Sequence, residues 1–372
     1  MPRRLAMTIG IFTMMIMGTG LLALYSATYE NVRVSRDVFY DQLGCAVVGL
    51  GVMFVLGRID YRKFFDAAYI GYGLNIFLLL VVLLAGRHVL GAKRWMEIGM
   101  LSFQPSEMMK LTLILALGRY FNNRRTFLSF NLRSRLSSLW GDLLFPFLLA
   151  GLPMILIFKQ PDLGTSFLIF GIFLAMLFAS GLEYKYITGF LLVILSVVPV
   201  GWHLLKGYQK MRILVFLNPN IDPLGAGYTI IQSKIAVGSG GLWGKGWLSG
   251  TQNQLNFLPE RHTDFIFSVI GEEWGLMGTV FTLGCFFVLI HCGLKIARQQ
   301  KDRFGMLVAV GIVTVLTLQV IVNVGMVLGL CPVVGITLPL ISYGRSSFMV
   351  FVVMMGFLLN LSKRRTVFGG EN

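Results

Sequence analysis

Charged residues are scarce in this chain, and acidic ones are the scarcest. Only 13% of its 372 residues are charged, and 17 acids stand against 32 lysines and arginines. A soluble chain of this length would carry about a quarter charged residues. Hydrophobic residues make up 56% of the chain, and its mean hydropathy is positive. This composition excludes an ordinary soluble domain and predicts a multi-pass membrane protein.

Cysteine is also rare. The four cysteines lie in or beside apolar runs, at positions 45, 285, 292 and 331, and their spacing is not that of metal ligands. We therefore expect no disulfide framework and interpret them as small buried hydrophobic side chains. The first apolar run is long and lacks a small-residue cleavage site, so a cleavable signal peptide is not expected.

The net charge of +15 would suit nucleic-acid binding in a soluble protein. In a membrane protein it is first a sign of topology, because Lys and Arg gather in cytoplasmic loops. It is second a sign of anionic lipid or phosphate ligands. We therefore expect membrane lipid, and no nucleic acid, as a partner. With the N-terminus inside, most of the basic excess lies on the cytoplasmic side, and both termini are cytoplasmic.

Apolar runs long enough to cross a bilayer recur along the whole chain. They predict an all-α fold of about ten transmembrane helices in a single domain, residues 1–372. The runs lie near 5–25, 41–57, 67–86, 105–121, 142–158, 164–181, 185–205, 265–294, 304–330 and 338–361. One large external loop, about residues 206–264, separates the seventh run from the eighth.

The end of this loop changes from polar to apolar within residues 250–275. Glu260, Arg261, His262 and Asp264 lie at the change. A carboxylate at the mouth of a membrane segment loses hydration, which is costly unless the group is paired or functional. A carboxylate at this change, Glu260 or Asp264, is therefore expected to be paired or functional. The alternative is that Thr263 or Asp264 is only the N-cap of the next helix.

A second pair of charges opens the fourth run. Glu107 and Lys110 are one helical turn apart, so their side chains can pair inside the bundle. The alternative is an ordinary helix start, with Pro105 in the first turn, Ser106 as cap and Glu107 favoured by the helix dipole. Asp162, after Pro161, is expected to be an N-cap.

Other residues on the external side are candidate contacts for an anionic ligand. They are Arg94, Arg212, Lys234 and Arg261, together with Lys110. Small polar residues between 339 and 347, Ser342 and Ser346 among them, can present backbone donors to an anion. They can equally permit close helix packing, and the sequence does not decide between the two.

Five motifs then occur in a recognisable order: FQPSE at 103–107, QPDLGT at 160–165, DPLGAGY at 222–228, LPERHTDFIF at 258–267 and PLISYGRSS at 339–347. They resemble the SEDS family (shape, elongation, division, sporulation) over nearly the whole chain. One position departs from the family pattern, because Arg345 follows Gly344 where the family has a second glycine.

The resemblance implies a peptidoglycan glycosyltransferase of the bacterial cytoplasmic (inner) membrane, with its active site on the external side. The implied activity is polymerisation of lipid II, a disaccharide-pentapeptide on undecaprenyl pyrophosphate, for cell-wall elongation and rod shape. Asp264 falls on the family's catalytic aspartate, and Glu107 and Lys110 fall on its helix-four acid and lysine. The implied partner is a class B penicillin-binding protein, a transpeptidase.

The chemistry fits these charges. Displacing a lipid pyrophosphate by a sugar hydroxyl needs a base for the hydroxyl proton and cations for the leaving anion. One carboxylate suffices for inversion, because no covalent intermediate is required, and we assign Asp264 as that base. A divalent cation, Mg²⁺ or Mn²⁺, is expected with the pyrophosphate, although the sequence shows no dedicated cage for it. The alternatives are a lipid II flippase or transporter and a non-catalytic scaffold for the penicillin-binding protein.

Overall fold

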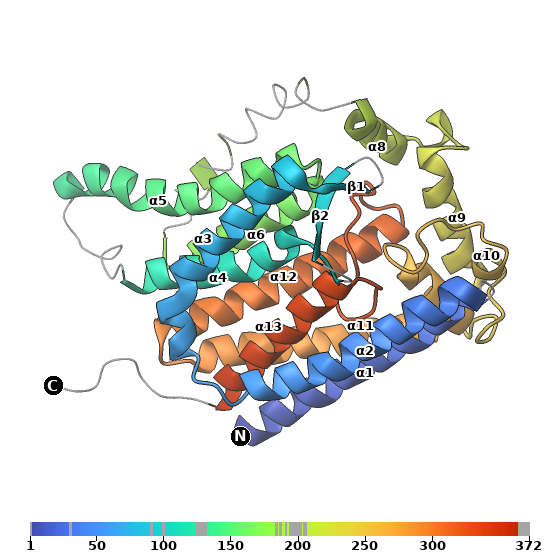
Figure 1. Ribbon diagram of the computed structural model, residues 1–372, viewed down its shortest axis with the longest axis horizontal. Coiled ribbons are helices and arrows are strands. Elements are labelled where there is room, and N and C mark those ends of the chain that lie inside the picture. The colour runs from blue at the N-terminus through green and yellow to red at the C-terminus, as the bar shows by residue number, and fades with distance from the viewer. Residues whose placement is uncertain are drawn as a thin grey trace.

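The structure is a computed structural model. It describes residues 2–29, 32–89, 92–98, 101–123, 132–182 and 207–363, and, between 183 and 206, only residues 185, 188, 189, 192 and 203. Most of these residues belong to helices (Figure 1). A bilayer offers no hydrogen-bond partners, so apolar segments satisfy their backbone groups within helices.

The long helices follow the apolar runs. They are α1 (Pro2–Thr28), α2 (Val32–Leu56), α3 (Arg62–Ala85), α4 (Pro105–Asn123), α5 (Leu132–Lys159), α6 (Leu163–Ala179), α11 (Ile266–Gln299), α12 (Arg303–Val327) and α13 (Arg345–Lys363). Among the described residues, six helices are long and apolar enough to span a membrane, namely α1, α2, α3, α11, α12 and α13. Two apolar segments, Leu144–Lys159 and Leu163–Ala179, are shorter.

These helices make a multi-pass membrane protein, whereas the predicted count of about ten stays a prediction. The seventh run, 185–205, falls almost entirely outside the described residues. The tenth run also begins later than expected, because residues 332–344, which include Pro332 and Pro339, are largely non-helical. A proline lacks the N–H that a helix interior needs.

The all-α prediction is wrong for the connection between α3 and α4. This stretch forms an antiparallel sheet in the order β1 (Arg87–Val89), β2 (Ala92–Ile98), β3 (Leu101–Phe103). Arg87 pairs with Trp95, and Met96 pairs with Phe103. Pairing satisfies the backbone of a connection that folds back on itself. Because β2 also packs against α3 and α4, the sheet holds Arg94 close to the start of α4.

The predicted external loop is largely helical. It contains α8 (Gly207–Leu217), the 3₁₀ turn η2 (Pro219–Ile221), α9 (Ala226–Ser239) and the short α10 (Thr251–Gln254). Helix α9 packs against α11 and α12, and Figure 1 shows α9 and α10 at the end of the bundle where α1 ends. Helix α11 kinks at Gly275, where φ is 64° and the backbone of Gly244 leaves no room for a Cβ.

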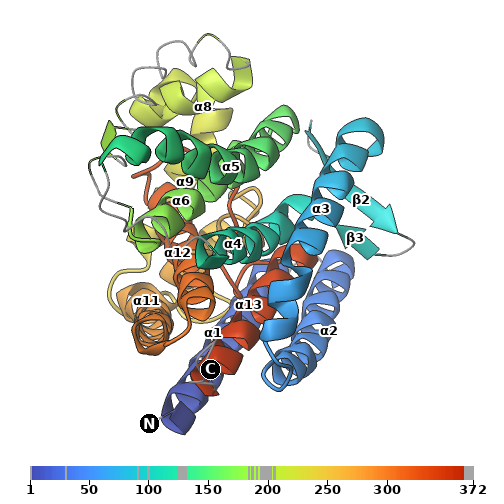
Figure 2. The same cartoon turned by 90° about the vertical axis from the view of Figure 1, so that its left-hand side faces the viewer.

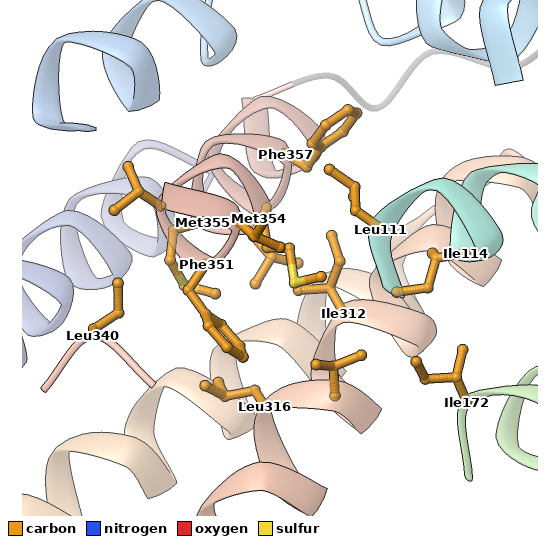
Figure 3. Close-up of a cluster of buried hydrophobic side chains, with 14 of the residues drawn as sticks. Leu111, Ile114, Ile172, Ile312, Leu316, Leu340, Phe351, Met354, Met355 and Phe357 are labelled. Atoms are coloured by element: carbon orange, nitrogen blue, oxygen red, sulfur yellow. The ribbon is translucent and has the colours of Figure 1, made fainter. Parts of the chain in front are cut away.

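Helix α13 lies at the centre of the core. It lies among α1, α2, α4 and α12 and contacts each of them (Figure 2). It is also far more buried than α1, α2 or α3. Its apolar side chains meet those of α4 and α12 in one cluster (Figure 3). The labelled members of the cluster include Leu111, Ile114, Ile312, Leu316, Phe351, Met354 and Met355.

The segment before α13 seats against α1 at a glycine. A Cβ on Gly20 would lie 2.7 Å from the Cα of Ile341 and 3.0 Å from the carbonyl oxygen of Leu340. Both neighbours are backbone atoms, which cannot turn away as a side chain can. Gly18, on the same helix, has nothing within 4 Å of the equivalent position.

We expect Gly20→Ala to destabilise the protein by about 1–3 kcal/mol, the usual cost of an overpacked interior. Gly18→Ala is the matched control, and it should melt at or slightly above the parent temperature because Ala favours helix by up to about 1 kcal/mol over Gly. Thermal melting of the purified proteins in one detergent makes the comparison. Equal melting temperatures for the two variants would contradict the seating of α1 against residues 340–341.

Candidate functional site

Asp264 lies in a tight turn immediately before α11. The carbonyl oxygen of Glu260 accepts backbone hydrogen bonds from Thr263 (3.2 Å), Asp264 (3.2 Å) and Phe265 (3.3 Å). The N-cap position of α11 is Phe265, and no side chain makes a cap hydrogen bond there. The explanation of Asp264 or Thr263 as a helix cap is therefore wrong. The Asp264 carboxylate therefore does not cap α11.

Charged groups from separate segments act on this carboxylate. The pKa of Asp264 is raised to about 6: burial raises it most, the negative charges of Glu260 and Asp162 also raise it, and Arg212 and Arg94 lower it. Arg94 comes from β2, Arg212 from α8, and Asp162 from the turn between α5 and α6. A carboxylate with this pKa is ionised at neutral pH and still basic enough to accept a proton.

Arg94 is held in place by the turn between α5 and α6. One of its terminal nitrogens donates to the carbonyl oxygen of Pro161 at 2.7 Å, and the other lies 4.0 Å from Asp162 Oδ1. Asp162 in turn accepts hydrogen bonds from the backbone N–H (3.1 Å) and the hydroxyl (3.0 Å) of Thr165. The predicted N-cap role of Asp162 is thus confirmed. The cap fixes a carboxylate, and that carboxylate helps to fix Arg94.

Glu107 and Lys110 form the predicted pair. Lys110 Nζ lies 2.7 Å from Glu107 Oε2, and it also donates to Gln319 Oε1 at 3.0 Å. The ammonium group is 5.5 Å from the centre of the Phe351 ring, within cation–π range. Lys110 is fully buried. The pair therefore neutralises itself inside the bundle, and we interpret it as support for the site.

Two residues of α12 belong to the site and were not predicted. Gln319 accepts from Lys110 and donates to the carbonyl of Thr337 at 3.2 Å. Asn323 donates to the carbonyls of Asp264 (2.9 Å) and Ile336 (2.7 Å). The signal was present in the sequence, because two side-chain amides four residues apart in an apolar run share one helix face.

Ser342 and Ser346 make hydrogen bonds within the protein. The Ser342 hydroxyl donates to the carbonyl of Thr263 at 2.5 Å and accepts from the N–H of Leu338 at 2.8 Å. The Ser346 hydroxyl accepts from the N–H of Gln104 at 3.0 Å. Both serines therefore hold segments together next to the Asp264 turn and the start of α4. These contacts favour the packing interpretation of the 339–347 motif over an anion site.

Arg261 and Lys234 lie in different surroundings. The guanidinium of buried Arg261 donates to the carbonyls of Ala27 (2.6 Å) and Asn253 (2.5 Å), which ties the end of α1 to α10. We interpret Arg261 as a residue that positions these segments. Lys234 is exposed on α9, with its side chain packed over Gly329 at the end of α12. Neither arrangement tests the predicted substrate contacts.

No group of three His, Cys, Asp or Glu side chains that could hold a metal ion occurs within the described residues. The divalent cation expected with the pyrophosphate therefore stays a prediction.

We expect Glu107→Ala to leave a buried, uncompensated ammonium on Lys110, which costs about 3–5 kcal/mol in comparable buried pairs. Its melting temperature and its yield should fall. The control is the double variant Glu107→Ala/Lys110→Met, which removes both charges and should recover much of the loss. A double variant as unstable as the single one would show that the ion pair is not the cause.

Comparisons with known proteins agree on one family. The family described as "Cell cycle protein", which covers FtsW, RodA and SpoVE, matches residues 6–367. The peptidoglycan glycosyltransferase MrdB of Escherichia coli K12 is 40% identical over 345 residues, covering 92% of this chain and 90% of MrdB. Stage V sporulation protein E of Bacillus subtilis is 36% identical over 359 residues and 95% of both chains.

Solved structures share the fold. A chain described under "Structural coordination of polymerization and crosslinking by a peptidoglycan synthase complex" has a TM-score of 0.80 at 32% identity, covering 96% of this chain and 97% of that one. RodA of Thermus thermophilus has a TM-score of 0.70 at 29% identity, covering 96% of each chain. The motifs, the fold and the match over residues 6–367 lead to one conclusion: the chain belongs to the FtsW/RodA/SpoVE family, the SEDS proteins.

Proposed function

We propose that this chain polymerises lipid II, with Asp264 as the general base and with Arg94 and Arg212 as the cations that stabilise the leaving pyrophosphate. Its relatives MrdB and RodA are named peptidoglycan glycosyltransferases, and the chain is an enzyme of this class. The observation that carries the proposal is a partly buried carboxylate, Asp264, whose pKa two guanidinium groups from distant segments lower by their charge.

Each group has a defined task in the reaction. An Asp264 carboxylate oxygen takes the proton of an acceptor sugar hydroxyl, and the hydroxyl oxygen bonds to the anomeric carbon of the donor sugar. The bond from that carbon to the pyrophosphate breaks, and its electron pair leaves with the phosphate oxygen. Guanidinium groups are suited to this anion because they donate in a planar fork. One displacement inverts the anomeric carbon, so a second carboxylate is not needed.

The location of the site fits a lipid-linked substrate. Asp264 is two residues before α11, a helix long enough to span the membrane. A carboxylate there can meet a sugar in water while the lipid part of the substrate stays in the bilayer. We assign this end of the bundle to the external face, because the basic segments predicted to be cytoplasmic lie at the opposite helix ends.

We also propose a class B penicillin-binding protein as the partner that crosslinks the new strand. The support is the structural similarity to a chain of a complex that coordinates polymerization and crosslinking. Polymer formation by the purified chain in detergent separates this function from that of a flippase or scaffold. Detergent has no two compartments, so a flippase would show no product, and neither would a scaffold.

Asp264→Asn is the decisive variant. It keeps the shape and hydrogen bonding of the side chain but cannot accept the proton, and loss of a general base costs about 10²–10⁴ in rate. Polymer formation from purified lipid II measures the rate, and a thermal melt of the same preparation confirms folding. A folded Asp264→Asn protein that polymerises at the parent rate would remove Asp264 from the mechanism.

The parent rate should also depend on pH through this group. The base works only when deprotonated, and its pKa is raised to about 6. We therefore expect kcat/KM, which reports the free enzyme, to fall as pH drops through about 6 and to be constant above it. The residual rate of Asp264→Asn should show no such limb.

Arg345, the departure from the family pattern, is expected to be dispensable. Its guanidinium forms an ion pair with Asp41 of α2, and both side chains are about a third exposed (28% and 37%). Exposed pairs contribute about 0–1 kcal/mol. Arg345→Gly should therefore polymerise lipid II at or above the parent rate, with Asp41→Ala as the control for loss of the pair. A large loss in Arg345→Gly alone would instead make Arg345 a substrate contact.

A further inference from the structure

Two side-chain amides on α12 connect the interior of the bundle to the Asp264 turn. Asn323 is fully buried, and its Nδ2 donates to the carbonyl oxygens of Asp264 (2.9 Å) and Ile336 (2.7 Å). One turn earlier, Gln319 bonds the next carbonyl along, that of Thr337, at 3.2 Å. The same Gln319 accepts from Lys110. The Glu107–Lys110 pair, the 336–337 backbone and the Asp264 turn therefore form one hydrogen-bonded network.

The Asp264 turn is held from both sides. Ser342 donates to the carbonyl of Thr263, and Asn323 donates to the next carbonyl, that of Asp264 itself. Because these two consecutive carbonyls are held, the backbone at Asp264 is restrained. The carboxylate can then move mainly by rotation about the side-chain bonds of Asp264. The carboxylate also lies over Gly335, since a Cβ there would be 3.5 Å from Asp264 Oδ2. Asn323 holds the carbonyl of the residue after Gly335, so it fixes both the Asp264 backbone and the surface beneath its carboxylate.

We infer that Asn323 is a positioning residue for glycosyl transfer, which holds the Asp264 turn so that its carboxylate stays in place over Gly335. The inference rests on the proposed role of Asp264. Catalytic groups must be kept within a fraction of an ångström of their productive position, and a misplacement of about 1 Å can cost 10²-fold in rate. Asn323 supplies this accuracy from a rigid helix and touches no reacting atom.

The chain contains a matched control for this residue. Asn360 of α13 is also buried, and its Nδ2 also donates to two backbone carbonyls, those of Leu56 (2.7 Å) and Ile59. These acceptors lie at the end of α2 and just beyond it, whereas Asp264 adjoins the start of α11. Asn323→Ala and Asn360→Ala therefore remove the same kind of contact, and only the first should disturb Asp264.

The experiment compares these variants with the parent as full-length proteins, purified in one detergent and supplied with lipid II. Asn323→Ala should lower kcat by about tenfold to a hundredfold, with the KM for lipid II changed less than twofold because Arg94 and Arg212 remain. Asn360→Ala should keep kcat within twofold of the parent even if it melts at the same lowered temperature. Equal kcat losses at equal melting shifts would overturn the inference.

The acid limb of the pH profile gives a readout that lost stability alone would not move. Glu260 on the same turn, Asp162 before α6, Arg212 of α8 and Arg94 of β2 all act on Asp264, and burial has the largest effect on its pKa. A carboxylate released toward water loses that burial. The limb should therefore move to lower pH in Asn323→Ala and stay in place in Asn360→Ala.

Hydrogen–deuterium exchange tests the same contact without any activity. In Asn323→Ala, the amides of Thr263, Asp264 and Phe265, which bond to the Glu260 carbonyl, should exchange at least tenfold faster than in the parent or Asn360→Ala. Unchanged exchange would overturn the inference. Asn323→Ser, which keeps one donor, replaces the Ala variant if that protein does not accumulate. An active Asp264→Asn protein would remove the proposed base, and the exchange result would still show whether Asn323 holds the turn.

Discussion

Non-helical backbone inside a membrane-spanning bundle must find hydrogen-bond partners within the protein, because lipid offers none. Residues 332–344 are such a segment, between α12 and α13. Side chains of α12 and of the segment itself satisfy part of this backbone. Gln319 bonds the Thr337 carbonyl, Asn323 bonds the Ile336 carbonyl, and Ser342 accepts from the Leu338 N–H. Two polar residues of the otherwise apolar α12, Gln319 and Asn323, thus stand where this backbone needs donors.

The candidate site is built on the same segment. The N–H of Tyr343 donates to the carbonyl of His262 at 2.9 Å, one residue before the carbonyl that Ser342 holds. The turn that carries Asp264 is thus bonded to the segment that α12 stabilises. On the other side of Asp264, Arg94 is attached to the turn that caps α6. A few residues therefore have two tasks each. Asp162 caps α6 and helps to hold Arg94, and Asn323 satisfies the Ile336 carbonyl and holds the Asp264 turn.

The sequence predicted well what depends on local patterns. Apolar runs located the long helices, and one-turn spacing located the Glu107–Lys110 pair. Asp162 was recognised as a cap from the preference of Asp for that position. The capping explanation for Asp264 failed because the same preference does not tell where a helix begins, and α11 begins two residues later.

What the sequence could not show depends on contacts between distant segments. Nothing local in Arg261 indicates that the Ala27 carbonyl, far away in the chain, will occupy its guanidinium. The sheet of β1, β2 and β3 packs through β2 against α3 and α4, and two of its strands, β1 and β3, are only three residues long, too short to be recognised alone. Arg94 and Arg212 were predicted by sign and side of the membrane. Their common action on one carboxylate required the fold.

The start of α11 sets the height of Asp264 relative to the bilayer, because the turn is rigidly joined to helices that span it. A substrate anchored by a polyprenyl chain carries its pyrophosphate at a height set by the same bilayer. Enzyme and substrate then differ only in lateral position and rotation about the membrane normal. The two therefore meet by diffusion within the plane of the membrane. The entropy of translation along the membrane normal is already lost before the reactants meet. A membrane of different thickness would change the vertical match between the carboxylate and the sugar without altering a single contact in the protein.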